Sequence, residues 1–311
     1  MEYILAGNIG GTNTQIALVD KSLNIIKKHS FLTKDISSSN ELDDIFVNFI
    51  KENSPDIIIK NCVLGCAGPI LFNKEKCKLS NSGLCIETIK LQKTKEKCNN
   101  IILINDMEAF AYGFSGSGNV NSDKILILMP GTGLGVVFLF KCPDNSYKVI
   151  SSEFSHNYIN LETKKDIELF NFFNNNMEFK YDNVVSGPGI VNLYKFLKGS
   201  NLNNPEEIVK KALSDYNNNN GSAELEAVKL FVYYIAKASA GLSLSFMPKT
   251  ILLAGNIINA VDGIIKNEFT DVFKKFFNKD YREFSDISIS FIENDEDLSL
   301  KGCADFGFKN P

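Results

Sequence analysis

The chain has 311 residues, of which 44% are hydrophobic and 23% are charged, and its formal net charge is −4. This composition is typical of an ordinary globular protein, and the length favours two domains over a single core. The lysines are scattered rather than gathered in a basic patch, and no apolar run approaches membrane-spanning length, so we expect neither a nucleic-acid partner nor a membrane.

Near the N-terminus, a glycine-rich turn joins two runs that read as strands. The segment is ILAGNIGGTNTQIALVD (residues 4–20), and its bend holds Gly10, Gly11, Thr12 and Asn13. Glycines allow positive φ and a close approach of a ligand to the backbone, while threonine and asparagine add side-chain donors. Such a turn can hold a phosphate group, although glycine-containing turns are also common in hairpins that bind nothing.

The following segments alternate between strand and helix patterns. Residues 57–69 form a β-rich run that ends in a glycine-proline turn, and IILI (101–104) is a short apolar strand candidate. MEAFAYGF (107–114) then places apolar side chains at helical spacing. Asn105 and Asp106 lie between this strand and helix. In an open α/β sheet that position faces a ligand crevice, but aspartate is also among the best helix N-cap residues.

A second glycine-rich hairpin, ILILMPGTGLGVVFLF (125–140), has Gly131, Thr132 and Gly133 at its bend. Two such hairpins in one chain suggest two halves that grip one polyphosphate, which indicates a phosphotransferase. No segment has the P-loop spacing Gly-x-x-x-x-Gly-Lys-Ser/Thr, and a strand-like run follows these glycines where a dinucleotide fingerprint needs a helix. A P-loop is therefore excluded, and a Rossmann oxidoreductase fits poorly.

Two loops after this hairpin carry further polar candidates. Glu153 and His156 are three residues apart, a spacing that suits two side chains converging on one polar ligand, but also a surface pair or half of a metal site. Asp182 lies just before SGPGIVNLYKFL (186–197), which combines a helix-start signal with an apolar periodic segment.

The rest of the chain supports a layered α/β protein. Residues 223–247 predict a long helix, with an apolar stripe formed by Leu225, Val228, Val232, Ile235 and Leu242. This helix ends before a proline, and TILLAG (250–255) predicts another buried strand. Sheets covered by helices are the architecture that this alternation indicates.

The cysteines and histidines are too few and too scattered for a metal centre or a disulfide framework. The seven cysteines are at positions 62, 66, 77, 85, 98, 142 and 303, an odd count without paired short spacings. His29 and His156 are the only histidines, so a His/Cys metal site is not expected. The N-terminus enters a strand directly, without the regions of a signal peptide. We expect a cytoplasmic protein with reduced, mostly buried thiols.

Taken in order, these motifs resemble the bacterial-type glucokinase family of the sugar-kinase/actin/Hsp70 ATPase superfamily. The matches run from about residue 2 to residue 304: Asn8-Ile9-Gly10-Gly11-Thr12-Asn13, Ala67-Gly68-Pro69, Ser80-Asn81, Ile104 to Ala109, the glycines 131–135, Glu153-Phe154-Ser155-His156, Val185 to Tyr194, and Leu253-Ala254-Gly255-Asn256-Ile257. Individually most of these motifs are weak, but eight in the family's order are hard to obtain by chance.

The resemblance implies a two-lobed α/β fold of the ribonuclease-H-like, actin-like ATPase type, with a cleft between the lobes and one phosphate hairpin from each. The small lobe would hold residues 1–105 and a returning helix in 297–311, and the large lobe would hold residues 106–296. Family members are commonly homodimers, so the resemblance also implies a homodimer.

The activity implied is transfer of the ATP γ-phosphate to the 6-hydroxyl of glucose, a step of glycolysis. Asp106 would be the general base, and the sugar would be bound by Asn81, Asn105, Asp106, Glu153, His156 and Asp182, the last standing where the family usually has glutamate. The ATP phosphates would lie against Gly10, Gly11, Thr12, Asn13, Gly131, Thr132 and Gly133. Mg²⁺ would bridge the β- and γ-oxygens, with Asn8 a weak ligand through water.

Three positions depart from the family's pattern. Asn8 replaces an aspartate that helps to hold hydrated magnesium, Phe154 and Ser155 replace two glycines, and Asn256 replaces a glycine beside the expected adenine region. If a replaced glycine needs positive φ, Phe154 would strain the pocket, whereas asparagine tolerates that conformation. Alternatives therefore remain: a catalytically weak or inactive homologue that senses sugar or serves as a regulatory subunit, or a kinase for another hexose.

Overall fold

The computed structural model describes residues 2–53, 58–71, 75–80, 82–116, 122–174, 177–199, 204–277, 279–292 and 297–310. The chain divides into two compact units, each of which is a mixed α/β assembly. The first unit comprises Met1–Asn121, Cys142–Ser151 and Asp295–Pro311, and the second comprises Ser122–Lys141 and Ser152–Asn294.

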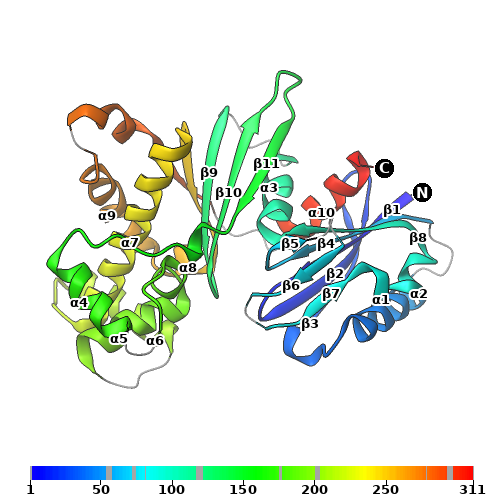
Figure 1. The fold of residues 1–311 in the computed structure, drawn as a ribbon, viewed down its shortest axis with the longest axis horizontal. Helices are drawn as coiled ribbons and strands as arrows, with labels where there is room; N and C mark the ends of the chain where they lie inside the picture. The colour runs from blue at the N-terminus through cyan, green and yellow to red at the C-terminus, as the bar shows by residue number, and fades with distance from the viewer. Residues whose placement is uncertain are drawn as a thin grey trace. The chain divides into compact units, whose positions relative to one another are not determined.

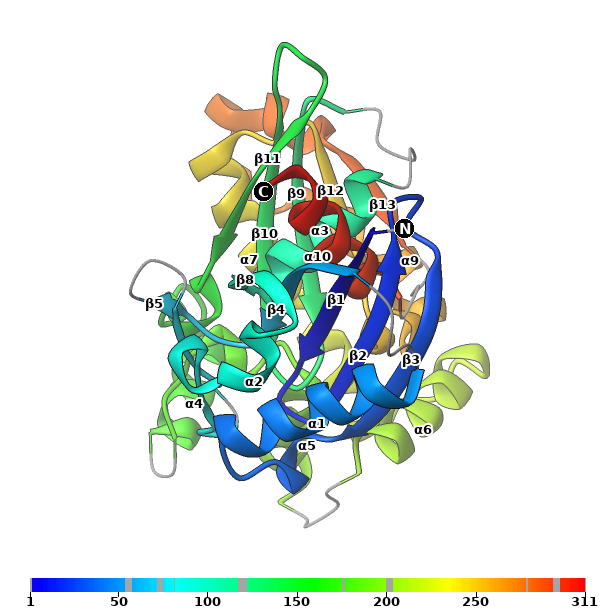
Figure 2. The same ribbon diagram turned by 90° about the vertical axis from the view of Figure 1, so that its right-hand side faces the viewer.

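The first unit is built on a five-stranded sheet with the order β3-β2-β1-β4-β8 (Figure 2). Its elements are β1 (Glu2–Ile9), β2 (Asn13–Asp20), β3 (Ile25–Leu32), α1 (Ser39–Asn53), β4 (Ile58–Cys66), β5 (Ile70–Leu71), β6 (Lys76–Lys78), β7 (Cys85–Glu87), α2 (Gln92–Lys95), β8 (Cys98–Asn105), α3 (Asp106–Gly116) and α10 (Leu298–Lys309). The β1–β2 and β2–β3 pairs are antiparallel, whereas β1–β4 and β4–β8 are parallel. Strands β5 to β7 form a separate small sheet.

The side chains of β1 alternate between two cores, as the period of a strand requires. Leu5 and Ile9 pack in a cluster with Phe46 of α1, whereas Ile4 and Ala6 pack in a cluster with residues of α10. Helices therefore cover both faces of the sheet, α1 and α2 on one and α3 and α10 on the other (Figure 1).

Helix α3 belongs to the first unit, although we expected the second lobe to begin at residue 106. It packs closely against the returning helix α10. A Cβ atom added to Gly302 of α10 would lie 1.7 Å from the carbonyl oxygen of Ala109, and one added to Gly113 of α3 would lie 2.0 Å from that of Leu298. Glycine at both positions lets the two helix backbones touch, and this contact holds α3 to the first sheet.

The second unit contains most of a sheet with the order β11-β10-β9-β12-β13. The elements of this part of the chain are β9 (Lys124–Pro130), β10 (Leu134–Lys141), β11 (Tyr147–Ser152), α4 (Lys164–Phe173), α5 (Gly187–Lys198), α6 (Pro205–Asn217), α7 (Ala223–Phe246), β12 (Thr250–Leu253), α8 (Asn256–Ala260), α9 (Asp262–Lys274) and β13 (Ser288–Phe291). Its β9–β10 pair is antiparallel, and β12 runs parallel to both β9 and β13. Leu126 and Leu128 of β9 pack with the helices in one large core.

The two sheets have the same plan: a central strand, a hairpin to one side and two parallel strands to the other. The α/β prediction and the duplication implied by the resemblance are confirmed by this repeat. The expected strand 250–255 is β12, the expected C-terminal helix is α10, and the predicted stripe of α7 is buried throughout.

Helix α7 departs from one expectation. Its 24 residues include a window of mean hydropathy 1.2, which by length and composition would be enough to cross a membrane. Inside the unit, however, 78% of that window is buried against the surrounding helices and sheet, as in the core helix of a globular domain. In the part of the chain that the structure describes, no other helix passes this test.

Candidate functional site

The carboxyl ends of β1, β4 and β8 lie side by side in the first unit. Ile9 pairs in register with Cys66, and Cys66 pairs with Asn105. The first glycine-rich turn, the Ala67-Gly68-Pro69 turn and Asp106 follow directly after these three strands. Residues from three distant stretches of sequence therefore meet at one sheet edge, which is where open α/β sheets bind ligands.

Thr33 forms hydrogen bonds to the backbone of the first glycine-rich turn, and the tip of the turn is exposed to solvent. The Gly10 N–H donates to the carbonyl of Asn13 at 3.0 Å, and the Thr33 hydroxyl donates to the carbonyl of Gly10 at 2.8 Å. The Thr33 N–H also donates to the carbonyl of Thr12 at 2.9 Å. Thr12 and Asn13 are exposed and Gly11 is half-buried. No local sequence pattern pointed to Thr33, which lies on a different turn.

Asn105 caps helix α3, and Asp106 is the first residue of that helix. The Met107 N–H donates to Oδ1 of Asn105 at 2.9 Å and to Oδ1 of Asp106 at 3.0 Å. The Asn105 amide also donates to the carbonyl of Gly68 at 3.3 Å. The capping role that the sequence left as an alternative for Asp106 is therefore taken by Asn105, and Asp106 lies at the sheet edge as the first residue of the helix. The Asp106 carboxylate is half-buried at the positive end of the helix dipole, which stabilises negative charge.

The thiols near Asp106 are poor candidates for chemistry. A hydrogen bond with Cys77, together with burial, raises the pKa of Cys66. Burial raises the pKa of Cys303 to about 12, with a smaller contribution from Asp106. Both side chains are buried. Because thiols react as thiolates, these two are inert at neutral pH.

The second glycine-rich turn forms a backbone cradle in the second unit. The Gly131 N–H donates to the carbonyl of Gly133 at 2.7 Å, and the Gly187 N–H, in the first turn of α5, donates to the carbonyl of Gly131 at 2.9 Å. Gly131 and Thr132 are exposed, and a Cβ added to Gly131 would meet no atom within 4 Å. This open glycine backbone beside a helix N-terminus fits a phosphate group.

Gly255 holds the neighbouring turn against the same hairpin. Its φ is 99°, and a Cβ added there would lie 2.9 Å from Cγ of Met129 and 3.1 Å from the carbonyl oxygen of Pro130. Only glycine combines this conformation with so close a contact. The predicted turn after TILL is therefore part of the cradle.

Asp182 reaches the second hairpin rather than standing apart from it. Its Oδ1 atom accepts a hydrogen bond from the Leu134 N–H at 2.8 Å. His156 ends the neighbouring short helix Phe154–His156 and Glu153 is its N-cap residue, with 3.5 Å between Oε2 of Glu153 and Nε2 of His156. Both of these side chains are close to half exposed, at 44% and 48%. Predicted sugar and phosphate residues thus adjoin one another in this unit.

Phe154 and Asn256 do not strain the backbone. The described residues other than glycine with positive φ are Leu23, Asn145, Asn219 and Met247, so neither replacement needs the left-handed conformation. The Phe154 ring stacks on Tyr181, with centroids 4.9 Å apart, and packs against the core. Asn256 begins helix α8 directly after Gly255.

Asn8 is the departure that changes the charge of the site. It pairs in register with Gly65, where an added Cβ would lie 2.9 Å from Ala109 of α3, so this face of the sheet carries the helix that begins at Asp106. Its neutral amide offers a hard cation only a carbonyl oxygen. Among the described residues no group of three or more His, Cys, Asp or Glu side chains forms a metal site.

Asn81 lies outside the described residues.

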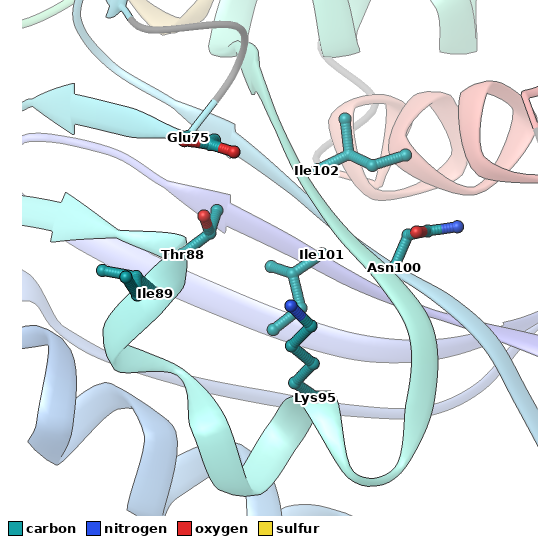
Figure 3. A pocket seen from close by; sticks show the side chains of 7 residues that line it. All are labelled: Glu75, Thr88, Ile89, Lys95, Asn100, Ile101 and Ile102. Atoms are coloured by element: carbon teal, nitrogen blue, oxygen red, sulfur yellow. The ribbon is translucent and has the colours of Figure 1, made fainter.

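A surface pocket of about 380 Å³ in the first unit is separate from the candidate site residues (Figure 3). It is lined by Thr88, Lys95 and the stretch 100–102 of β8 among others, none of which is a candidate site residue.

Solved structures with the same fold include both enzymes and a regulator. The glucokinase of Balamuthia mandrillaris in complex with glucose has a TM-score of 0.82 at 19% identity, covering 99% of this chain and 94% of that one. A ROK-family glucokinase of Streptomyces griseus, in complex with glucose and AMPPNP, has a TM-score of 0.71 at 15% identity and covers 99% and 100%. A ROK-family transcriptional regulator has a TM-score of 0.75 at 14% identity and covers 99% and 78%. These likenesses show the actin-like ATPase fold.

Sequence comparison shows the family. A glucokinase of Nostoc punctiforme is 32% identical over 216 residues, which span 64% of this chain and 61% of that relative, less than two thirds of its length. A glucokinase of Sinorhizobium fredii is 27% identical over 291 residues, which span 87% and 82%. The family model described as Glucokinase matches residues 5–304. With nearly the whole chain matched, the protein belongs to the glucokinase family.

Proposed function

We propose that the protein is a glucokinase that transfers the γ-phosphoryl group of ATP to the 6-hydroxyl of glucose. The observation that carries this proposal is the register of the first sheet, which brings Asp106, a half-buried carboxylate, to the same edge as an open glycine-rich turn. Family membership supports it, as do the neighbours solved with glucose and with AMPPNP.

Asp106 acts as the general base in this proposal. It accepts the proton of the 6-hydroxyl as that oxygen bonds to the γ-phosphorus, and the bond from the γ-phosphorus to the bridging oxygen breaks to release ADP. The Met107 N–H, which donates to Oδ1, holds the carboxylate in one orientation. The Asn105 amide is fixed by Gly68 and Met107, so it can present its remaining N–H to a neighbouring sugar hydroxyl.

Glu153, His156 and Asp182 bind further hydroxyls of the sugar, together with Asn81. Carboxylates and imidazole that point at hydroxyl groups reject sugars that lack those groups, since the protein groups would remain unpaired. The glycine-rich turns at 10–13 and 131–133 bind the phosphates of ATP through backbone N–H groups. Magnesium, when bound, screens the phosphate charge. A cytoplasmic homodimer acting in glycolysis is the setting that we propose for this activity.

The test is a coupled assay of ADP production with the purified full chain, Mg-ATP and a panel of glucose, mannose, fructose and N-acetylglucosamine. Asp106→Asn keeps an oxygen that can accept from Met107 but removes the base, so the rate with glucose should fall by about 10²–10⁴-fold. Asp144→Asn, in an exposed turn, is the matched control and should behave as the wild type. Equal rates in Asp106→Asn and the wild type would refute the role of Asp106, and preference for another hexose would revise the substrate.

The second candidate function is a sugar sensor without useful catalysis. Asn8 is the observation that favours it, because a neutral amide at this position weakens the magnesium side of the site. A structural neighbour described as a transcriptional regulator has the same fold, and one fold can carry different functions. The sensor would be silent in the assay while glucose still raised its Tm, a result that the kinase proposal does not allow.

A further inference from the structure

The segment from Asp182 to Gly187 forms two hydrogen bonds with the second glycine-rich hairpin. In one, Oδ1 of Asp182 accepts from the Leu134 N–H at 2.8 Å; in the other, the Gly187 N–H donates to the carbonyl of Gly131 at 2.9 Å. The contact with Asp182 is tight. A Cβ added to Gly133 would lie 2.5 Å from the same carboxylate oxygen.

Asp182 itself is held firmly, so its carboxylate has a defined position. The Ser186 hydroxyl, at the N-cap of α5, donates to the carbonyl of Asp182 at 2.8 Å. On the preceding side, Tyr181 is buried under the stacked ring of Phe154, and its N–H donates to the carbonyl of Asn157 at 3.3 Å. These contacts also fix the short helix Phe154–His156, with Glu153 at its N-cap, beside the Asp182 turn.

The two oxygens of the Asp182 carboxylate differ in their hydrogen-bond partners. Oδ1 is committed to the backbone of the hairpin. Within the described part of the chain no hydrogen bond reaches Oδ2, and the residue is only half-buried, so Oδ2 can accept from a ligand hydroxyl. A carboxylate that accepts from two donors at once transmits a restraint from one to the other.

We propose that Asp182 is a positioning residue that couples the sugar to the phosphate-binding hairpin, one oxygen fixing the Leu134 N–H while the other accepts a sugar hydroxyl. This inference rests on the proposed function. It adds that Asp182, a sugar-binding side chain, holds the 131–133 hairpin in the conformation that binds nucleotide. Sugar and nucleotide therefore bind cooperatively.

The experiment measures the dissociation constants of glucose and of a non-hydrolysable ATP analogue by calorimetry, each alone and in the presence of the other. In Asp182→Ala, the analogue should bind about tenfold more weakly even without sugar, as expected for the loss of one charge-assisted hydrogen bond. Asp182→Asn keeps an acceptor for the Leu134 N–H but replaces the second acceptor with a donor. It should bind the analogue within about twofold of the wild type, bind glucose about tenfold more weakly and lose the cooperativity.

Gly133→Ala tests the contact from the opposite side. The added methyl group displaces the Asp182 carboxylate, so glucose affinity should fall although Gly133 binds phosphate in the proposed function. In the Asp182→Ala background the same change should cost glucose affinity little. Asp144→Ala is the matched control, because Asp144 also accepts from a hairpin backbone N–H, that of Ser146, at the other end of β10. Its affinities for both ligands should equal those of the wild type.

The outcomes separate this inference from the function on which it rests. If the wild type binds both ligands and Asp182→Ala, still folded and with an unchanged Tm, weakens glucose alone, Asp182 is only a sugar ligand and the coupling is refuted. Equal loss of nucleotide affinity in Asp182→Asn and Asp182→Ala would also refute it, since the conservative variant keeps the acceptor. A wild type that binds neither ligand overturns the proposed function and this inference together.

Discussion

At the scale of single residues, Asn8 is the position that sets the charge on the magnesium side of the proposed site. It lies next to the end of β1, half-buried, on the sheet face that carries α3. Its amide has nearly the shape of a carboxylate but no charge. If a magnesium ion is bound to position 8 through water, the missing negative charge lowers its affinity without changing the fold.

Asn8→Asp should lower the magnesium concentration needed for half-maximal rate by about tenfold, the low end for outer-shell partners of a metal. The measurement is the initial rate against free Mg²⁺ at saturating ATP and glucose. Asn267→Asp adds the same charge on the exposed surface of α9 and should leave the magnesium dependence unchanged. Identical curves for Asn8→Asp and the wild type would show that position 8 does not limit the reaction.

At the scale of elements, the α3–α10 crossing links the C-terminus to the candidate base. Gly113 and Gly302 let the helix backbones meet, and Asp106 is the first residue of α3. Gly307 of α10 also lies where an added Cβ would be 2.8 Å from Val63 of β4. The position of Asp106 therefore depends on a helix that begins 192 residues later in the chain.

Gly302→Ala should destabilise the protein by about 1–3 kcal/mol, because its methyl group overlaps the carbonyl of Ala109 and forces the helices apart. It should also lower the rate, since α3 carries Asp106. Gly241→Ala is the control: that glycine is exposed near the C-terminal end of α7 with no atom within 4 Å of an added Cβ, so alanine should stabilise by about 0.5–1 kcal/mol. Urea unfolding measures both, and an unchanged midpoint for Gly302→Ala would contradict the overlap.

The elements that the sequence predicted are those with a local signature. The apolar stripe of α7, the buried strand β12 and the two glycine hairpins each follow from neighbouring residues. Three contacts have no local signature because they join residues far apart in the chain. They are the Thr33–Gly10 hydrogen bond (23 positions apart), the Asp182–Leu134 hydrogen bond (48) and the Gly302–Ala109 contact (193). Family motifs located Asp182, but its bond to the hairpin required coordinates.

At the scale of the whole molecule, each unit has its own hydrophobic core, and the second also contains a buried polar cluster. Asp166 of α4 accepts from the Tyr234 hydroxyl at 2.7 Å and contacts Nζ of Lys237 at 3.3 Å. Lys237 also donates to the carbonyl of Asn160 at 2.7 Å. Burial opposes ionisation of Asp166, but the hydrogen bonds from Tyr234, Glu162 and Thr163 and the charge of Lys237 outweigh it and lower its pKa.

A lowered carboxylate pKa in the folded state stabilises the protein above the unfolded pKa, and this contribution disappears as the pH falls through the folded value. Lys237→Met removes the cation and leaves Asp166 with less compensation, so the variant should lose about 3 kcal/mol of unfolding free energy at pH 7. The loss should shrink as the pH falls through the lowered pKa of Asp166, below its ordinary value of 3.8, because the carboxylate then becomes protonated in the folded wild type as well. Lys266→Met breaks an exposed pair with Asp262 and should cost less than about 1 kcal/mol at either pH.

Hydrogen exchange locates the effect of Lys237→Met within the molecule. If the two units unfold separately, amides of α4 and α7 should lose protection while those of β1 and β4 keep it, because the cluster belongs to the second core alone. Loss of protection in both units to the same degree would mean that they unfold as one cooperative body. In that case unfolding of either core would also unfold the other, so a mutation that destabilises one core would lower ligand affinity at both hairpins.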